Sequence, residues 1–143
     1  MIQFQNELKV EAPVSDVYNF IARLENFPLW NYAVSEVRNL RKKNEKGQDL
    51  YGIYRNTTGP KYEEGYLKSY EENKQLIMVV SGGWFPYELE YNFRTEDQNT
   101  FMSNVARIYP SKVSFLPLQL AKHQLQKAVY QNLYVLKNTV EKL

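Results

Sequence analysis

The sequence contains no cysteine and only one histidine, so several kinds of functional site are excluded at once. Without cysteine there are no disulfide bonds, thiolate ligands or thiol redox reactions. The single histidine, His123, is too little for the usual transition-metal sites, and it falls on the polar side of a predicted helix, which argues against a Ser-His-Asp arrangement. We therefore nominate no metal site, no cofactor and no catalytic residue.

Strong net charge, phosphate-binding motifs and long apolar runs are also missing. The formal net charge is only +2, which does not indicate a nucleic-acid partner. No GxGxxG or P-loop motif supports nucleotide binding by those routes. No apolar run reaches membrane-spanning length, and residues 1–5 lack the features of a signal peptide. We expect a cytoplasmic protein that is a monomer or a weak homodimer.

What the chain does have is length and aromatic residues. A chain of 143 residues is normally one domain, here residues 1–143, and can bury a substantial core. Aromatic residues make up 15% of the chain and include 12 tyrosines. Because buried tyrosine hydroxyls need polar partners, this composition favours a sheet with a lined interior over a minimal packed core.

The last 31 residues, 113–143, predict one long helix with one apolar face. Apolar residues recur there at three- and four-residue steps and fall within an arc of about 140°. The helix would be roughly 40 Å long at 1.5 Å per residue. Leu133, Leu136, Val140 and Leu143 are the predicted anchors, and residues 115–117 the predicted hinge. Leu118, Ala121 and Leu125 are predicted to form the roof of a pocket.

The chain before this helix reads as one strand, two short helices and six further strands. Residues 2–10 alternate between apolar and polar, Pro13 suits the first position of a short helix, and Asn26 can cap a second one. The later strands are predicted at residues 34–42, 49–55, 62–70, 75–81, 85–94 and 101–109. Their short connections, including a turn at residues 56–60, predict an antiparallel meander, and the first strand can pair with the last. The fold class is α+β.

Two stretches resemble a known superfamily. Residues 10–21 (VEAPVSDVYNFI) followed by residues 25–30 (ENFPLW) resemble its opening, A-P-x-x-x-V-[aromatic]-x-[aromatic]-I and then N-x-P-x-W. Residues 133–141 (LYVLKNTVE) resemble its closing L-x-x-L-K-x-x-x-E. With the element order, the chain resembles the START-like helix-grip proteins, the SRPBCC group, which includes polyketide cyclase/dehydrase-like and lipid-transport-like proteins.

This resemblance implies a curved antiparallel sheet of about seven strands wrapped round the C-terminal helix, with two short helices after strand 1. It also implies a cavity between sheet and helix that binds a hydrophobic or amphipathic small molecule. Some members are cyclases, dehydratases or hydroxylase components, and many only bind or carry. No catalytic set of the group matches positions in this chain, and fold does not fix function.

Candidate ligand-binding residues come from the helix, the strands and two tryptophans. Asn132 lies inside the apolar arc and must bind either a structural partner or the ligand. The aromatic row of residues 85–93 is either ordinary core or a pocket wall. The full set is Asn132, Leu125, Ala121, Tyr87, Tyr91, Tyr66, Ile53, Phe101, Trp84 and Trp30. The tryptophans either gate the cavity mouth or are half-covered turn residues.

Three functions compete on this scaffold. The first is a non-catalytic carrier or sensor of a hydrophobic small molecule. The second is a cyclase- or dehydratase-type enzyme, which needs a buried titratable group beside tyrosine hydroxyls. The nominated charges for that group are Arg55, Glu64, Lys68 and Arg107. The third is an interaction module with a filled core and an exposed tryptophan. The basic residues 38–46 are read as a solvated surface, with membrane docking as the alternative.

Overall fold

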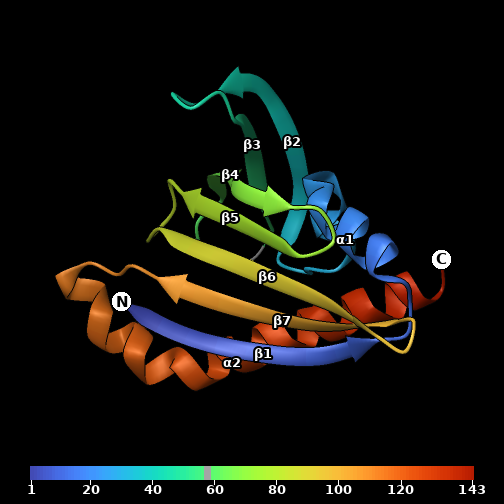
Figure 1. Cartoon of the computed structure of the whole chain (residues 1–143). Helices are drawn as coiled ribbons and strands as arrows, with labels where there is room; N and C mark the ends of the chain where they lie inside the picture. Colours follow the sequence, from blue (N-terminus) through green and yellow to red (C-terminus); the bar gives the residue numbers. More distant parts are fainter. Residues whose placement is uncertain (57–58) are drawn as a thin grey trace.

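The computed structural model describes residues 1–56 and 59–143 of the chain (Figure 1). The elements are β1 (Ile2–Val10), α1 (Val14–Ala22), η1 (Leu24–Leu29), β2 (Val34–Lys43), β3 (Asp49–Arg55), β4 (Tyr62–Glu71), β5 (Gln75–Ser81), β6 (Tyr87–Glu96), β7 (Asn99–Ile108) and α2 (Lys112–Glu141). This order confirms the predicted α+β helix-grip arrangement. The predicted turn at residues 56–60 includes residues 57 and 58, which lie outside the described residues.

The seven strands form one antiparallel sheet in the order β1-β7-β6-β5-β4-β3-β2. β1 pairs with β7 from Ile2 opposite Ile108 to Val10 opposite Thr100, which confirms that the first strand joins the last. Figure 1 shows β2 and β3 rising steeply from the rest, so that the sheet is curved. β6 starts after Pro86 rather than at residue 85, because proline has no N–H for a strand hydrogen bond.

The long helix starts within one residue of its predicted first position, but the predicted hinge before it and the predicted cap of the second short helix are wrong. α2 begins directly after Ser111, which forms a capping box with Ser114, and Pro117 lies inside the helix instead of in a hinge. η1 is a 3₁₀-helix preceded by Arg23, so Asn26 is not its cap. The Asn26 amide instead donates to the Phe20 carbonyl and ties the two short helices together.

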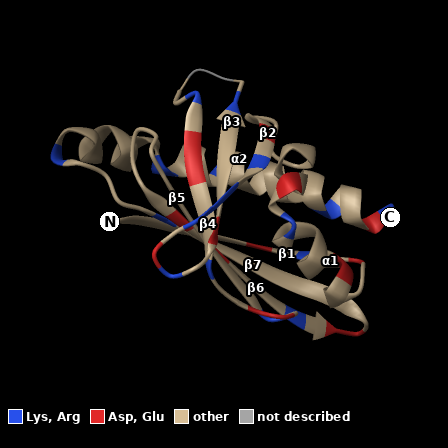
Figure 2. Cartoon of the chain, turned by 90° about the horizontal axis from the view of Figure 1, so that it is seen from above, with Lys and Arg blue, Asp and Glu red and all other residues tan. Residues whose placement is uncertain are grey.

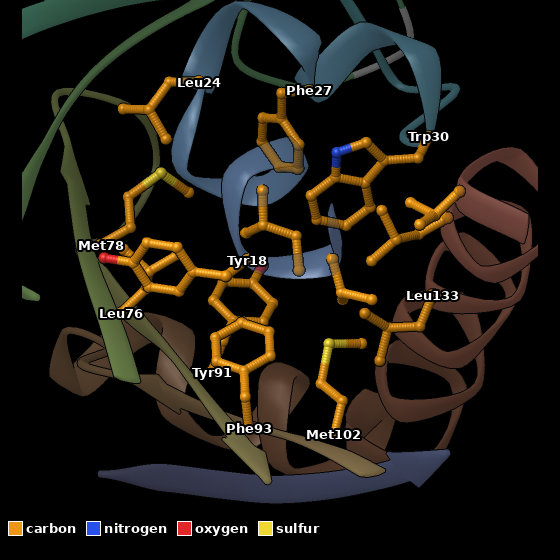
Figure 3. Close-up of a cluster of buried hydrophobic side chains, with 14 of the residues drawn as sticks. Tyr18, Leu24, Phe27, Trp30, Leu76, Met78, Tyr91, Phe93, Met102 and Leu133 are labelled. Carbon is orange, nitrogen blue, oxygen red and sulfur yellow. The ribbon is translucent and has the colours of Figure 1, made fainter. Parts of the chain in front are cut away.

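The main core lies where the short helices, the sheet and the second half of α2 meet (Figure 3). Leu133 and Leu136 are fully buried and Val140 nearly so, which confirms these anchors, whereas Leu143 follows the helix end and is exposed. Aromatic rings pack edge to face around them: Tyr18 against Phe93, and Trp30 against Tyr91. This half of the concave space is therefore filled.

An asparagine pair marks the limit of this core. Asn6 and Asn104 are direct partners between β1 and β7, one step beyond the core residues Leu8 and Met102. Asn6 donates to the Gln126 carbonyl of α2, while the buried Asn104 amide has no hydrogen-bond partner among the described residues. Beyond the pair lies a second, smaller cluster of Ile2, Phe4, Ala106 and Ile108. The asparagine pair thus divides the concave face into one half that holds the main core and another half that holds this smaller cluster.

The surface carries mixed charge. Figure 2 shows basic and acidic residues interspersed over strands and helices. The predicted basic residues Arg38, Arg41, Lys42, Lys43 and Lys46 are exposed, as is His123 on α2. Arg38 pairs with Glu36 and Lys43 with Asp49, as expected for a solvated surface. Among the described residues, no helix has both the length and the apolar character needed to cross a bilayer.

Candidate functional site

A cavity of about 400 Å³ lies between the sheet and residues 118–132 of α2. It is within the usual range of small-molecule sites, about 300–1,000 Å³. Apolar side chains form most of its wall, from the sheet Phe4, Leu89, Ala106 and Ile108, and from the helix Leu118, Leu125, Ala128 and Val129. Ala128 leaves room because its short side chain stops well below the sheet.

Loop residues surround the mouth of the cavity. Trp84, in the β5–β6 loop, and Tyr32, in the loop before β2, both line it while remaining 71% and 69% exposed. The Trp84 ring extends over the turn before β4, where a Cβ on Gly59 would lie 4.0 Å from it. The mouth is therefore bordered by aromatic rings.

One polar cluster interrupts the apolar wall. Arg55 at the end of β3 donates from Nε to Glu63 Oε1 of β4 at 2.5 Å. Its Nη2 donates to the Tyr87 hydroxyl of β6 at 2.8 Å, and that hydroxyl donates to Glu63 Oε1 at 3.2 Å. The side chains of Arg55 and Glu63 are only 17% and 3% exposed. We call these three residues the polar trio.

Backbone geometry buries the trio. The β5–β6 loop passes so close to Glu63 that a Cβ on Gly83 would lie 2.7 Å from its Oε2 atom. Only glycine fits there without displacing the carboxylate, so this close packing requires Gly83. The loop that carries Trp84 thereby closes one side of the cluster.

Burial and charge together set the protonation of the trio. Burial raises the pKa of the Tyr87 hydroxyl well above its ordinary value, opposed by Arg55 and reinforced by Glu63. Burial alone would lower the pKa of Arg55, but Tyr87 and Glu63 outweigh it and raise that pKa. At neutral pH the Arg55 guanidinium is therefore charged and the Tyr87 phenol is neutral, and Glu63 is the ion-pair partner of Arg55.

Four of the predicted ligand-binding residues line the cavity: Asn132, Leu125, Tyr87 and Trp84. The Asn132 side chain lines the cavity and makes no hydrogen bond to a described residue, so it has no structural partner there. The others lie elsewhere. Ile53, Tyr91 and Trp30 are buried in the main core, Tyr66 and Phe101 lie on the outer face of the sheet, and Ala121 is on α2 outside the lining.

Strand alternation explains the two outward aromatic residues. Glu63 and Gly65 face the interior, so Tyr66 between Gly65 and the next inward residue points outward. In β7 the buried Met102 faces inward, and Phe101 lies on the other face under the Arg94 guanidinium at 4.2 Å. The sequence did not reveal the inward face of β4, because the tyrosines fall on one face and the residues that face inward begin with Glu63 and Gly65, which are not apolar.

Of the nominated charges, only Arg55 reaches the cavity. The others pair on the outer face of the sheet: Lys68 and Arg107 with Glu88, and Glu64 with Tyr62. Sequence reasoning missed Glu63. The signal that could have identified it is its position two residues before Gly65, which places both residues on the same face of β4. Within residues 1–56 and 59–143, no group of three histidine, cysteine or acidic residues is placed to hold a metal ion.

The buried tyrosines predict a loss of stability at alkaline pH. Burial raises the pKa of Tyr91 as it does that of Tyr87, and the Tyr91 hydroxyl has no hydrogen-bond partner among the described residues. The folded chain keeps both protonated while the unfolded chain loses protons above about pH 10, so their contribution to stability is present below that pH and is lost as the pH rises. For each tyrosine we expect a slope that increases through pH 10 towards a limit of about 1.4 kcal/mol per pH unit.

Urea unfolding at a series of pH values from about 9 to 11 measures this slope. Tyr91→Phe should flatten it and should leave stability at neutral pH unchanged or slightly higher, because the lost hydroxyl is unpaired. A slope in Tyr91→Phe equal to that of the original chain would contradict the assignment.

A sequence profile of the family described as polyketide cyclase/dehydrase and lipid transport matches residues 10–134. No curated protein shows significant sequence similarity to the chain. Three solved structures share the fold at low sequence identity. TTHA0849 from Thermus thermophilus is 18% identical with a TM-score of 0.74, and 97% of each chain is covered.

A START superfamily protein from Mycobacterium smegmatis is 14% identical, covering 98% of this chain and 97% of that one, with a TM-score of 0.78. The di-domain ARO/CYC StfQ from the steffimycin biosynthetic pathway is 10% identical, covering 99% of this chain and 51% of that one, with a TM-score of 0.77. At these identities the structures establish the fold alone. Because the profile match extends over residues 10–134, the chain belongs to the polyketide cyclase/dehydrase and lipid transport family of START-like (SRPBCC) proteins.

Proposed function

We propose that this protein binds a hydrophobic or amphipathic small molecule in the cavity under α2, as a non-catalytic carrier or sensor. The observation that carries the proposal is the cavity of about 400 Å³, whose wall is apolar except for the polar trio and the asparagines Asn31 and Asn132. Apolar walls supply affinity, and a few fixed polar groups orient the ligand. Membership of the family supports a ligand-binding scaffold of this kind.

The roles of individual residues follow from their positions. Leu118, Leu125 and Val129 provide apolar contact from the helix, and Trp84 lies at the entrance. The Asn132 amide is available to a ligand because no described residue occupies it. Binding there would replace hydrogen bonds to water by one to the ligand, a net gain of about 0.5–1.5 kcal/mol.

Blocking the cavity tests the proposal. Phenylnaphthylamine, a neutral apolar fluorophore, should bind the original chain with increased fluorescence. Ala128→Phe places a ring in the cavity and should weaken that binding by about tenfold or more, since it removes the apolar space that holds the probe. Ala121→Phe is the matched control, because Ala121 lies on the same helix outside the lining, and it should leave binding nearly unchanged.

Native mass spectrometry after mild extraction provides an independent test, with a co-purifying small molecule as the expected result. Thermal unfolding of both alanine variants checks that they are folded. The proposal is wrong if no small molecule co-purifies and phenylnaphthylamine binds Ala128→Phe as well as it binds Ala121→Phe.

The polar trio favours one second candidate, a cyclase- or dehydratase-type enzyme on the same scaffold. Such an enzyme needs a buried titratable group beside a tyrosine hydroxyl, and Arg55 and Glu63 both contact Tyr87. Ligands recovered from the original chain and from Glu63→Gln distinguish the two candidates. An enzyme yields from the original chain a product that has lost water, and the unconverted precursor from the variant. A carrier yields the same compound from both.

The third hypothesis, an interaction module, requires a filled core, and the cavity does not fit that requirement. Trp84 is exposed, as that hypothesis requires, but the space beside it is open and lined by apolar side chains. A ligand therefore accounts for this part of the molecule better than a protein partner does.

A further inference from the structure

We infer that the ligand is electrically neutral and carries a hydroxyl group that contacts Arg55 and Tyr87. This inference rests on the proposed binding function and specifies the chemical class of the ligand. It is based on the charge balance and the hydrogen-bond inventory of the polar trio.

The charge of the trio is already balanced. Arg55 is a single positive charge and Glu63 a single negative charge, joined at 2.5 Å, and Tyr87 is neutral. No other charged side chain lines the cavity among the described residues. A guanidinium in a cavity usually suggests recognition of a carboxylate. Here the partner carboxylate comes from the protein.

A charged ligand would upset that balance. A carboxylate beside Arg55 would also lie beside Glu63, leaving one uncompensated negative charge in a largely apolar site. Burial of an unpaired charge is strongly unfavourable. An ammonium group beside Glu63 would also lie beside Arg55, leaving one uncompensated positive charge. The site therefore selects against anionic and cationic ligands, because Glu63 neutralises the charge of Arg55.

The hydrogen-bond inventory then specifies the polar group. Tyr87 accepts from Arg55 and donates to Glu63, so its proton is used and one lone pair remains. Arg55 has five N–H groups and uses two of them within the trio, one on Nε and one on Nη2, so the two on Nη1 and the second on Nη2 have no partner among the described residues. The trio thus offers a ligand both N–H donors and acceptor lone pairs. A hydroxyl group, which both accepts and donates, can bind one of each together.

A pair of matched probes tests the charge selection. Naphthylethanol and naphthylacetate share the same ring and differ in a hydroxyl against a carboxylate. The original chain should bind naphthylethanol about tenfold or more tightly than naphthylacetate at neutral pH, because of the cost of an unpaired buried charge. Glu63→Gln leaves Arg55 uncompensated and should reverse the preference. The double variant Arg55→Gln with Glu63→Gln is neutral again and should restore it.

Glu64→Gln is the matched control, because it removes the same charge from the neighbouring residue on the outer face. It should leave the preference unchanged. The hydroxyl contact is tested by the ratio of naphthylethanol to ethylnaphthalene affinity, which should fall several-fold in Tyr87→Phe.

The outcomes separate the inference from the function. If neither naphthylethanol nor phenylnaphthylamine binds, the proposed function fails. If both bind but the original chain prefers naphthylacetate, or Glu64→Gln changes the preference as much as Glu63→Gln does, only this inference is overturned. Thermal unfolding shows whether Glu63→Gln is folded, and if it is not, the preference of the original chain decides the question.

Discussion

Replacement of Leu136 by alanine is expected to lower the free energy of unfolding by about 2–5 kcal/mol. Leu136 is fully buried where α2 meets the sheet and the short helices. Truncation removes apolar contacts and leaves a hole that a close-packed core fills only in part. The measurement is the urea unfolding midpoint, which should decrease with little change in the slope of the transition.

The matched control is Leu120→Ala on the same helix, because Leu120 is 76% exposed. The chemical change is identical and the position differs, so a small effect is expected. Equal losses in the two variants would mean that the second half of α2 is not the anchor of the fold.

Arg55→Met is expected to destabilise the protein by about 3–5 kcal/mol, because it leaves the buried Glu63 carboxylate without its counter-charge. The side chain of Glu63 is only 3% exposed, so water cannot replace the lost guanidinium. Replacing both residues with methionine should recover most of the loss, since the lone charge is then gone. Unfolding free energies of the single and double variants form a double-mutant cycle that measures the coupling.

Arg38→Met provides the comparison. Arg38 pairs with Glu36 at 2.6 Å on the surface, where both side chains are well exposed, and solvent screens such pairs. Its removal should change stability little. If Arg55→Met costs no more than Arg38→Met, or if the double methionine variant is as unstable as Arg55→Met, the trio is not a desolvated ion pair.

Strand β6 shows what alternation in a sequence can predict and what it cannot. Alternation correctly indicated that Tyr87, Leu89, Tyr91 and Phe93 share the inner face of β6. It could not indicate that Tyr87 reaches the cavity while Tyr91 packs in the core. That difference depends on what covers each position. Tyr87 faces the open space beneath α2, whereas Tyr91 is covered by Trp30 at the end of the short helices.

The same limit accounts for Glu63. Read locally, β4 offers Tyr62, Glu64 and Tyr66 as one face and Glu63 with Gly65 as the other, and the tyrosines look like the better wall. The structure makes the opposite choice: Gly65 faces the interior, where a Cβ would lie 3.2 Å from the Ile53 side chain and 3.5 Å from that of Val80.

Element order, the antiparallel meander, the long final helix and the family were thus readable from the chain, because each depends on local periodicity and on short motifs. The arrangement of the candidate site was only partly readable, since it depends on contacts between distant positions. Arg55 and Tyr87 are 32 residues apart, and Glu63 belongs to a third strand. The register of the curved sheet brings them together, and the open space between the sheet and α2 makes them the polar part of a cavity.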